Sequence, residues 1–189
     1  GYLDDYAFLI DGLINLYEAT FDQRWLDEAL TLNDTLIKYY WDEKDGGFYF
    51  TASDGEALIA RSKSPGDGAI PSGNSVAASN LLRLAILFDR KDYREKAEAL
   101  FRAFGTQMTQ SPSSFERLLC SLDFYHAKVK EIAIIGDPKA AETQALLATV
   151  WSKYRPNKVV VHSTSAAPQD HKLPLLRGKT LVKGAPAAY

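Results

Sequence analysis

The chain has 189 residues, of which 46% are hydrophobic, and its formal net charge is -2. This length can bury one sizeable core or two modest ones, and the balanced charge offers no basic footprint for a nucleic acid or an anionic membrane. We therefore expect neither as a partner. The single cysteine, Cys120, excludes an internal disulfide framework and is typical of a reducing compartment, so we expect a cytoplasmic protein.

Two helices are predicted within the first 40 residues. Residues 3–19 are apolar nearly all round, which is typical of an inner helix packed between neighbours. The polar positions of this helix form one narrow stripe: Asp4, Asp11, Gly12 and Asn15. Residues 22–40 have one apolar and one charged face, which is typical of an outer helix, and Asp22 is its expected N-cap.

A long connection, residues 41–71, follows the second helix. Connections of this length inside a compact domain are uncommon and are usually functional or disordered. Residues 48–50 and 57–60 predict a small β-hairpin that turns at Asp54-Gly55. We therefore expect an ordered insert on one face of the helical part.

Three further helices are predicted after this insert. Residues 72–88 form an inner-type helix and residues 91–108 its outer partner. The polar stripe of the inner helix consists of Ser72, Ser79, Asn80 and Arg83. Ser111-Pro112 is a favourable N-cap and N1 pair, so a fifth helix is expected to begin there and to end near residue 126.

The two pairs of helices repeat each other with an offset of about 68 residues. Trp25 and Ala29 are echoed by Tyr93 and Ala97, and the two polar stripes also match. Repeated helical hairpins form solenoids or closed rings, because one hairpin cannot bury its apolar face alone. We predict a mainly α fold with hairpins over residues 1–127, in which the N-termini of the inner helices share one face.

The remaining residues have a different pattern. A buried strand at 131–135, a helix at 138–154 and a strand at 158–162 predict a parallel βαβ unit within residues 128–165. Residues 166–189 are expected to be an extended tail on the surface.

The strongest local motif, residues 67–75, leads into the second inner helix. Ser72, Asn74 and Ser75 place short polar side chains and free amides at a positive helix end, which suits a hydroxyl or anionic ligand. Asp67 is a candidate acid, base or sugar-binding group. The alternative is an elaborate N-cap in which Asp67 braces the loop.

A second motif stands at the equivalent end of the first inner helix. Asp4 and Asp5 are candidate catalytic carboxylates, and Tyr6 beside them is a candidate substrate contact. The alternative is that these acidic residues offset the helix dipole. Asp11 further along the helix and Tyr49 in the insert are further candidate contacts, the latter by stacking on a sugar ring or simply by packing.

The sequence gives no reason to expect a metal or a cofactor. His126, His162 and His171 do not have metal-ligand spacing. The turn at Gly136-Asp137 lies between a strand and a helix but lacks a glycine-rich loop, which makes nucleotide binding the weakest hypothesis.

Residues 1–7, 41–50 and 67–75 resemble the C-terminal half of an uncharacterised family, the thioredoxin-domain-containing proteins related to spermatogenesis-associated protein 20 and bacterial YyaL. The resemblance implies that the helices are the last part of an (α/α)6 toroid of the six-hairpin glycosidase type. It also implies a thioredoxin-like domain and earlier hairpins before Gly1. Because the sole methionine is Met108, we expect the chain to be a piece of a larger polypeptide.

Two functions follow from these observations. The first is a toroid cleft that binds a carbohydrate or polyol and hydrolyses or isomerises it if the protein is an enzyme. The alternative is a non-catalytic module that binds partners for an attached thioredoxin-like redox domain. In both cases the missing N-terminal part of the same polypeptide is an expected partner.

Overall fold

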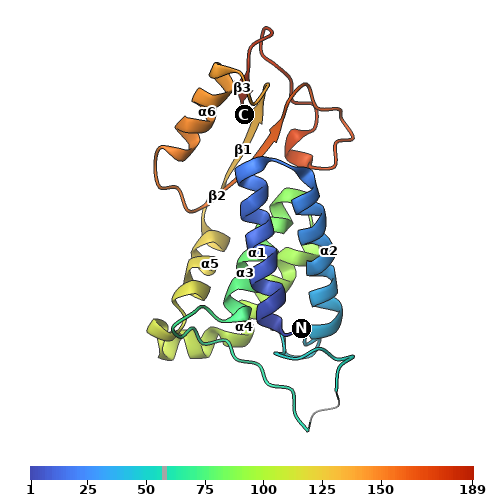
Figure 1. Ribbon diagram of the computed structural model, residues 1–189. Helices are drawn as coiled ribbons and strands as arrows, with labels where there is room; N and C mark the ends of the chain where they lie inside the picture. The colour runs from blue at the N-terminus through green and yellow to red at the C-terminus, as the bar shows by residue number, and fades with distance from the viewer. Residues whose placement is uncertain (57–58) are drawn as a thin grey trace. The chain divides into compact units, whose positions relative to one another are not determined.

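The computed structural model describes residues 1–56 and 59–189, which form two compact units (Figure 1). The first unit consists of residues 1–85 and 90–126 and is helical. The second consists of residues 86–89 and 127–189 and contains a small sheet. None of the helices in the described part of the chain is long and apolar enough to cross a membrane.

The first unit confirms the predicted helical hairpins. Its helices are α1 (Leu3–Thr20), α2 (Gln23–Tyr40), α3 (Gly73–Phe88), α4 (Lys91–Gln110) and α5 (Glu116–His126). The expected start of the fifth helix at Ser111 was wrong, because Pro112–Ser114 forms a separate 3-10 turn, η1, before α5 begins. Ser111 Oγ lies 3.1 Å from Ser114 Oγ and caps no backbone amide.

Both hairpins turn through a residue with a left-handed backbone conformation. α1 and α2 pack side by side (Figure 1). The Asp22 carboxylate accepts a hydrogen bond from the Arg24 amide at 3.1 Å, as expected of the N-cap. The turn residues Phe21 and Asp89 lie one repeat apart and have φ values of 56° and 54°. The repeat is therefore present in the backbone as well as in the side chains.

The polar stripes of the inner helices meet in a cluster that we call the inner seam: Asp11, Asn15 and Glu18 of α1, Ser79, Asn80 and Arg83 of α3, and Arg117 of α5. Arg83 donates to Asn15 at 2.8 Å and pairs with Glu18 at 3.4 Å. Asn80 donates to the Ala7 carbonyl at 2.8 Å. The predicted stripes are thus largely an interface between neighbouring inner helices.

The insert does not contain the predicted strand at 48–50. Trp41 and Phe48 form an isolated antiparallel bridge, and the Phe50 amide donates to the Ser62 carbonyl at 2.8 Å. The second predicted strand, 57–60, includes residues 57–58, which lie outside the described residues. A buried cluster orders the start of the insert instead, since Asp42 accepts hydrogen bonds from Lys63 at 2.6 Å and from Tyr49 at 2.7 Å.

The second unit confirms the parallel βαβ prediction. Strands β1 (Lys130–Ile135) and β2 (Lys158–Ser163) pair in parallel, and α6 (Ala141–Trp151) lies between them in the chain. The tail is not simply extended, because β3 (Ala187–Ala188) pairs antiparallel with β1 and a 3-10 turn, η2 (Pro174–Leu176), precedes it. Burial of Leu173 and Leu176 favours this ordered path over a loose surface strand.

Candidate functional site

A pocket of about 260 Å³ lies between the N-terminal ends of α1 and α3; we call it the N-terminal pocket. Leu3 and Asp4 line it from α1, Ser72 and Gly73 from the start of α3, and Phe50 and Ser64 from the insert. The pocket joins the two motifs that the sequence places at matched repeat positions. It therefore confirms that the inner helices present their N-termini on one face.

Asp4 is the carboxylate of this pocket. Partial burial, followed by the nearby Asp5 carboxylate, raises the pKa of Asp4 above its ordinary value, while a hydrogen bond from the Gly73 amide works against this shift. The approach is close: a Cβ atom at Gly73 would overlap Asp4 Oδ1 and lie 2.6 Å from Leu3 Cγ. Glycine at this position therefore allows α1 and α3 to meet at the pocket.

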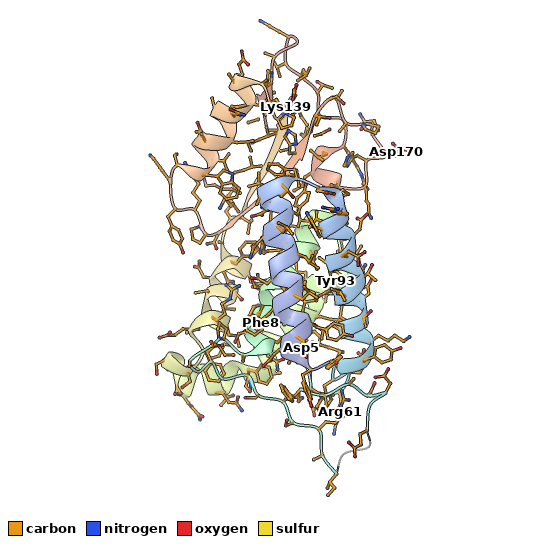
Figure 2. The ribbon with its side chains drawn as sticks, in the orientation of Figure 1. Asp5, Phe8, Arg61, Tyr93, Lys139 and Asp170 are labelled. Carbon is orange, nitrogen blue, oxygen red and sulfur yellow. The ribbon has the colours of Figure 1, made fainter. Side chains whose placement is uncertain are left out.

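Asp5 has a capping role. Asp5 lies in the first turn of α1 (Figure 2), and its Oδ2 atom accepts a hydrogen bond from the Tyr2 amide at 2.8 Å. Tyr6 is half-buried, and its ring packs against the Tyr40 ring with the centroids 5.4 Å apart. Neither residue lines the N-terminal pocket.

Both carboxylate oxygens of Asp67 hold backbone amides. Oδ1 accepts from the Ser72 amide at 2.9 Å and Oδ2 from the Arg117 amide at 2.8 Å. The Asp67 amide in turn donates to the Ser114 carbonyl at 2.7 Å. One side chain thus satisfies free amides at the beginnings of α3 and α5, which favours the bracing alternative over a catalytic one.

The other polar residues of the 67–75 motif are also bonded within the protein. The Ser72 hydroxyl caps α3 by accepting from the Ser75 amide at 3.1 Å, and it donates to the Pro65 carbonyl at 2.9 Å. Asn74 is fully buried and binds both the amide and the carbonyl of Phe48, at 2.8 Å and 3.0 Å. Ser72 lines the pocket, whereas Asn74 and Ser75 do not.

Two predicted contacts lie away from the pocket. Asp11 belongs to the inner seam, where Arg83 and Arg117 approach it at 3.4 Å and 3.7 Å. Tyr49 donates to Asp42 in the insert, which raises the pKa of Tyr49. Of the nine predicted site residues, the structure brings Asp4 and Ser72 together in the pocket.

Sequence reasoning missed the part of the pocket that the insert supplies. The Phe50 carbonyl accepts a hydrogen bond from the Leu3 amide at 3.0 Å, which fixes the insert against the start of α1. Ser64 reaches the pocket from the same segment. The length of residues 41–71 was the available signal, but no residue pattern there identified these two positions.

The histidines do not assemble a metal site. Within residues 1–56 and 59–189, no three His, Cys, Asp or Glu side chains gather closely enough to hold a metal ion. His162 lies in β2, where burial lowers its pKa and its Nε2 atom is 2.9 Å from the Gly136 carbonyl. The Gly136 turn is thus bonded to a neighbouring strand.

Comparison with known proteins gives relatives but no matching family model. The chain is 43% identical over 162 residues to mouse spermatogenesis-associated protein 20, covering 85% of this chain and 20% of the mouse protein. The human protein of that name is 41% identical over the same share of this chain and 21% of its own length. An uncharacterized protein of Caenorhabditis elegans is 29% identical over 86% of this chain and 22% of its own length. The chain spans about a fifth of the length of these curated relatives.

Proposed function

Because this chain is related to the family of spermatogenesis-associated protein 20 along most of its length, we propose that it is a helical-repeat segment that binds a small carbohydrate or polyol in the N-terminal pocket. The observation that carries the proposal is the placement of Asp4, with its raised pKa, in a pocket formed where two inner helices begin. Perturbed carboxylates in pockets are common at functional sites.

The composition of the pocket supports a ligand that is polar on its edges and apolar on its faces. Ser64 supplies a hydroxyl group, Asp4 supplies a carboxyl group, and Phe50 supplies an aromatic surface. The volume of about 260 Å³ is slightly below the range of roughly 300–1,000 Å³ that holds drug-sized ligands. A ligand of the size of one sugar ring therefore fits the pocket better than an oligosaccharide.

We assign the acid–base role to Asp4 alone. A raised pKa brings a carboxyl group closer to the range in which it can both give and take a proton near neutral pH. Asp67 and Asp5 do not line the pocket and are bonded to backbone amides, so we assign them positioning roles. This arrangement favours binding or isomerisation over glycoside hydrolysis, which uses a pair of free carboxyl groups.

A thermal-shift titration with monosaccharides and polyols tests the proposal. A ligand at 100 times its dissociation constant stabilises a protein by about 2.7 kcal/mol, which is readily measured. We expect the shift to be lost in Asp4→Asn and retained in Asp5→Asn, its neighbour outside the pocket. No shift with any compound would refute carbohydrate binding, and an equal shift in both variants would remove Asp4 from the site.

A second candidate function is a non-catalytic module that binds a partner, such as the thioredoxin-like domain that the family resemblance implies. It is favoured by the exposed apolar face of α1, on which Phe8 is labelled in Figure 2. Phe8, Leu9 and Leu16 have 38%, 54% and 38% of their surface exposed. The positions one repeat later on α3 are buried: Val76, Ala77 and Leu84. Leu9→Glu should then abolish partner binding or self-association in light scattering without changing ligand-induced thermal shifts.

A further inference from the structure

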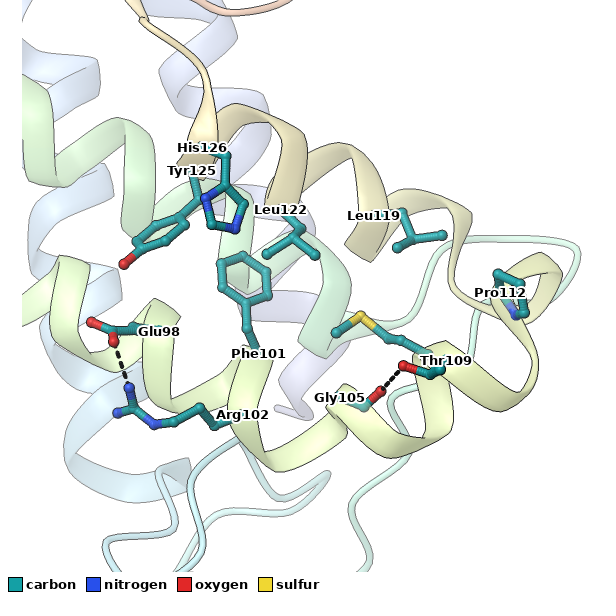
Figure 3. A pocket seen from close by; sticks show the side chains of 11 residues that line it. Glu98, Phe101, Arg102, Gly105, Thr109, Pro112, Leu119, Leu122, Tyr125 and His126 are labelled. Atoms are coloured by element: carbon teal, nitrogen blue, oxygen red, sulfur yellow. Dashed lines mark hydrogen bonds and ion pairs between the residues drawn. The ribbon is translucent and has the colours of Figure 1, made fainter.

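An apolar groove of about 570 Å³ runs between α4 and α5 within the first unit (Figure 3). Phe101 and Met108 line it from α4, and Leu119 and Leu122 face them from α5 (Figure 3). Glu98 and Arg102 form an ion pair of 2.6 Å at one edge. Neither of the functions proposed above uses this groove.

The helical repeat shows what occupies the equivalent place one hairpin earlier. In that place, α4 contacts α2 and the residue that ends it. Tyr93 donates to Asp34 at 2.5 Å, Arg90 pairs with Asp34 at 3.4 Å, and the Lys96 ammonium lies 4.7 Å from the centre of a Trp41 ring. The outer helix of one hairpin thus packs on the outer helix of the preceding hairpin.

The same positions on α4 lack such a cover. Phe101 and Arg102 correspond by repeat position to Asn33 and Asp34. The Asp34 and Arg102 side chains are 52% and 65% exposed, but Asp34 receives Arg90 from the next hairpin, whereas Arg102 pairs with Glu98 of its own helix. Trp41, which contacts Lys96 of α4, corresponds to Thr109, and Arg102 and Thr109 both line the groove. The groove is therefore located where the next outer helix of the array would pack.

α5 has the contacts of an inner helix, and within residues 1–56 and 59–189 no outer helix follows it as α2 follows α1. Ser121 donates to the Ser75 carbonyl of α3 at 3.3 Å and Arg117 to Ser79 at 3.3 Å, as Asn80 of α3 donates to α1. After α5 the chain continues into strand β1 and not into an outer helix. The third hairpin of the array is thus half complete.

We propose that the α4–α5 groove binds an amphipathic helix contributed by the same polypeptide outside residues 1–189. The matched segment is 20% of the mouse relative, so most of that relative's sequence is available to supply such a helix. The helix would fill the groove with apolar side chains spaced three or four residues apart. The helix would also carry a carboxylate that pairs with Arg102. In the ion pair one hairpin earlier the charges are the other way round, because Asp34 of α2 supplies the carboxylate and Arg90, at the start of α4, supplies the cation.

Cysteine labelling tests this proposal in the longer polypeptide and in the 189-residue chain. Thr109→Cys in a Cys120→Ser background places a reporter at the groove, since Thr109 lines it and Cys120 is exposed. Glu28→Cys in the same background is the control, because Glu28 is exposed on α2. We expect alkylation of the groove reporter to be at least about tenfold slower in the longer polypeptide and the control to be unchanged.

Equal alkylation of the groove reporter in both proteins would overturn the proposal. Slower alkylation of the 189-residue chain at high concentration, together with a dimer in light scattering, would also overturn it, because the occupant would then be a second copy. Arg102→Glu gives an independent check at a surface position. In the longer polypeptide this charge reversal should speed alkylation at Thr109→Cys at least about fivefold, whereas Glu28→Lys should leave it unchanged.

Discussion

The N-terminal ends of α1 and α3 occupy the same repeat position and face the same pocket, yet they use their polar residues differently. At α3, Asp67, Ser72 and Asn74 direct their hydrogen bonds to backbone groups of the protein. At α1, Asp4 meets one amide, that of Gly73, and lines the pocket. The motif at the start of α3 contains more of the residue types that are common in functional sites, yet its side chains mainly stabilise the fold.

This difference shows what a dense polar motif at a helix start does in this fold. The described residues of the insert, 41–56 and 59–71, form no regular strand, so their peptide groups need other partners. Asn74 supplies two of them to Phe48, and Asp67 joins the starts of α3 and α5. The following predictions test this division between structural and functional polar groups.

The largest effect is expected for Asn74→Ala. The substitution leaves the buried amide and carbonyl of Phe48 without partners, and each such group costs roughly 1–3 kcal/mol. We expect the free energy of unfolding to fall by about 3 kcal/mol in urea denaturation. Asn80→Ala is the matched control: Asn80 is equally buried but makes one bond, to Ala7, so it should cost about 1 kcal/mol. Equal losses would contradict the bracing role of Asn74.

Asp67→Ala is expected to have the next largest effect. It removes the acceptors of the Ser72 and Arg117 amides at two helix starts, and each lost cap costs about 1 kcal/mol. The free energy of unfolding should therefore fall by about 2 kcal/mol, and Asp67→Asn should lose less because one oxygen remains. Unchanged stability combined with lost ligand binding would instead make Asp67 a functional residue.

Gly73→Ala and Gly12→Ala should have opposite effects. The new methyl group at Gly73 would meet Asp4 and Leu3, and such overpacking costs roughly 1–3 kcal/mol. A methyl group at Gly12 would have no atom within 4 Å apart from the adjacent residues and the backbone of its own helix, so alanine should stabilise the helix by about 0.5–1 kcal/mol. Thermal unfolding should show a lower melting temperature for Gly73→Ala and a higher one for Gly12→Ala. An unchanged melting temperature for Gly73→Ala would show that α1 and α3 are not in close contact at the pocket.

Asp4→Asn should have the smallest effect, with a distinctive pH dependence. Because the pKa of Asp4 is raised in the folded state, its stabilising contribution is present at low pH and is lost as the pH rises through that pKa. The variant should therefore gain stability relative to the wild type at pH 7 more than at pH 3.

Asp42→Asn should lose stability at pH 7, because the Lys63 ammonium holds the pKa of Asp42 well below its usual range.

The sequence predicted the repeated part of the fold because periodic patterns report directly on helix packing. The matched stripes ending at Asn15 and Arg83 predicted neighbouring inner helices, and these two side chains bond at 2.8 Å. The predicted strand at 48–50 failed because Phe48 bonds to a side chain, Asn74, which no strand pattern indicates. The pairing of Ala187–Ala188 with β1 also escaped prediction, since two alanines have no alternation to detect.

The candidate site was predictable in position more than in composition. Matched motifs at the starts of two inner helices located the pocket, and Asp4 and Ser72 line it. The assignment of roles depended on where each oxygen points, which residue type alone does not give. Asp5 and Asp67 carry the same carboxyl group as Asp4, and all three accept hydrogen bonds from backbone amides, but of the three it is Asp4 that lines the pocket.

The left-handed residues Phe21 and Asp89 have a consequence for how the array can grow. Each hairpin reverses direction at one residue with nearly the same φ, so a single torsion angle sets the step from inner to outer helix in both repeats. Phe21 also packs edge-on against Tyr17, with ring centroids 5.8 Å apart, which ties that angle to the core. A non-glycine residue in this conformation costs roughly 1–2 kcal/mol. Glycine at either turn would avoid this cost, but it would also give the turn more conformational freedom.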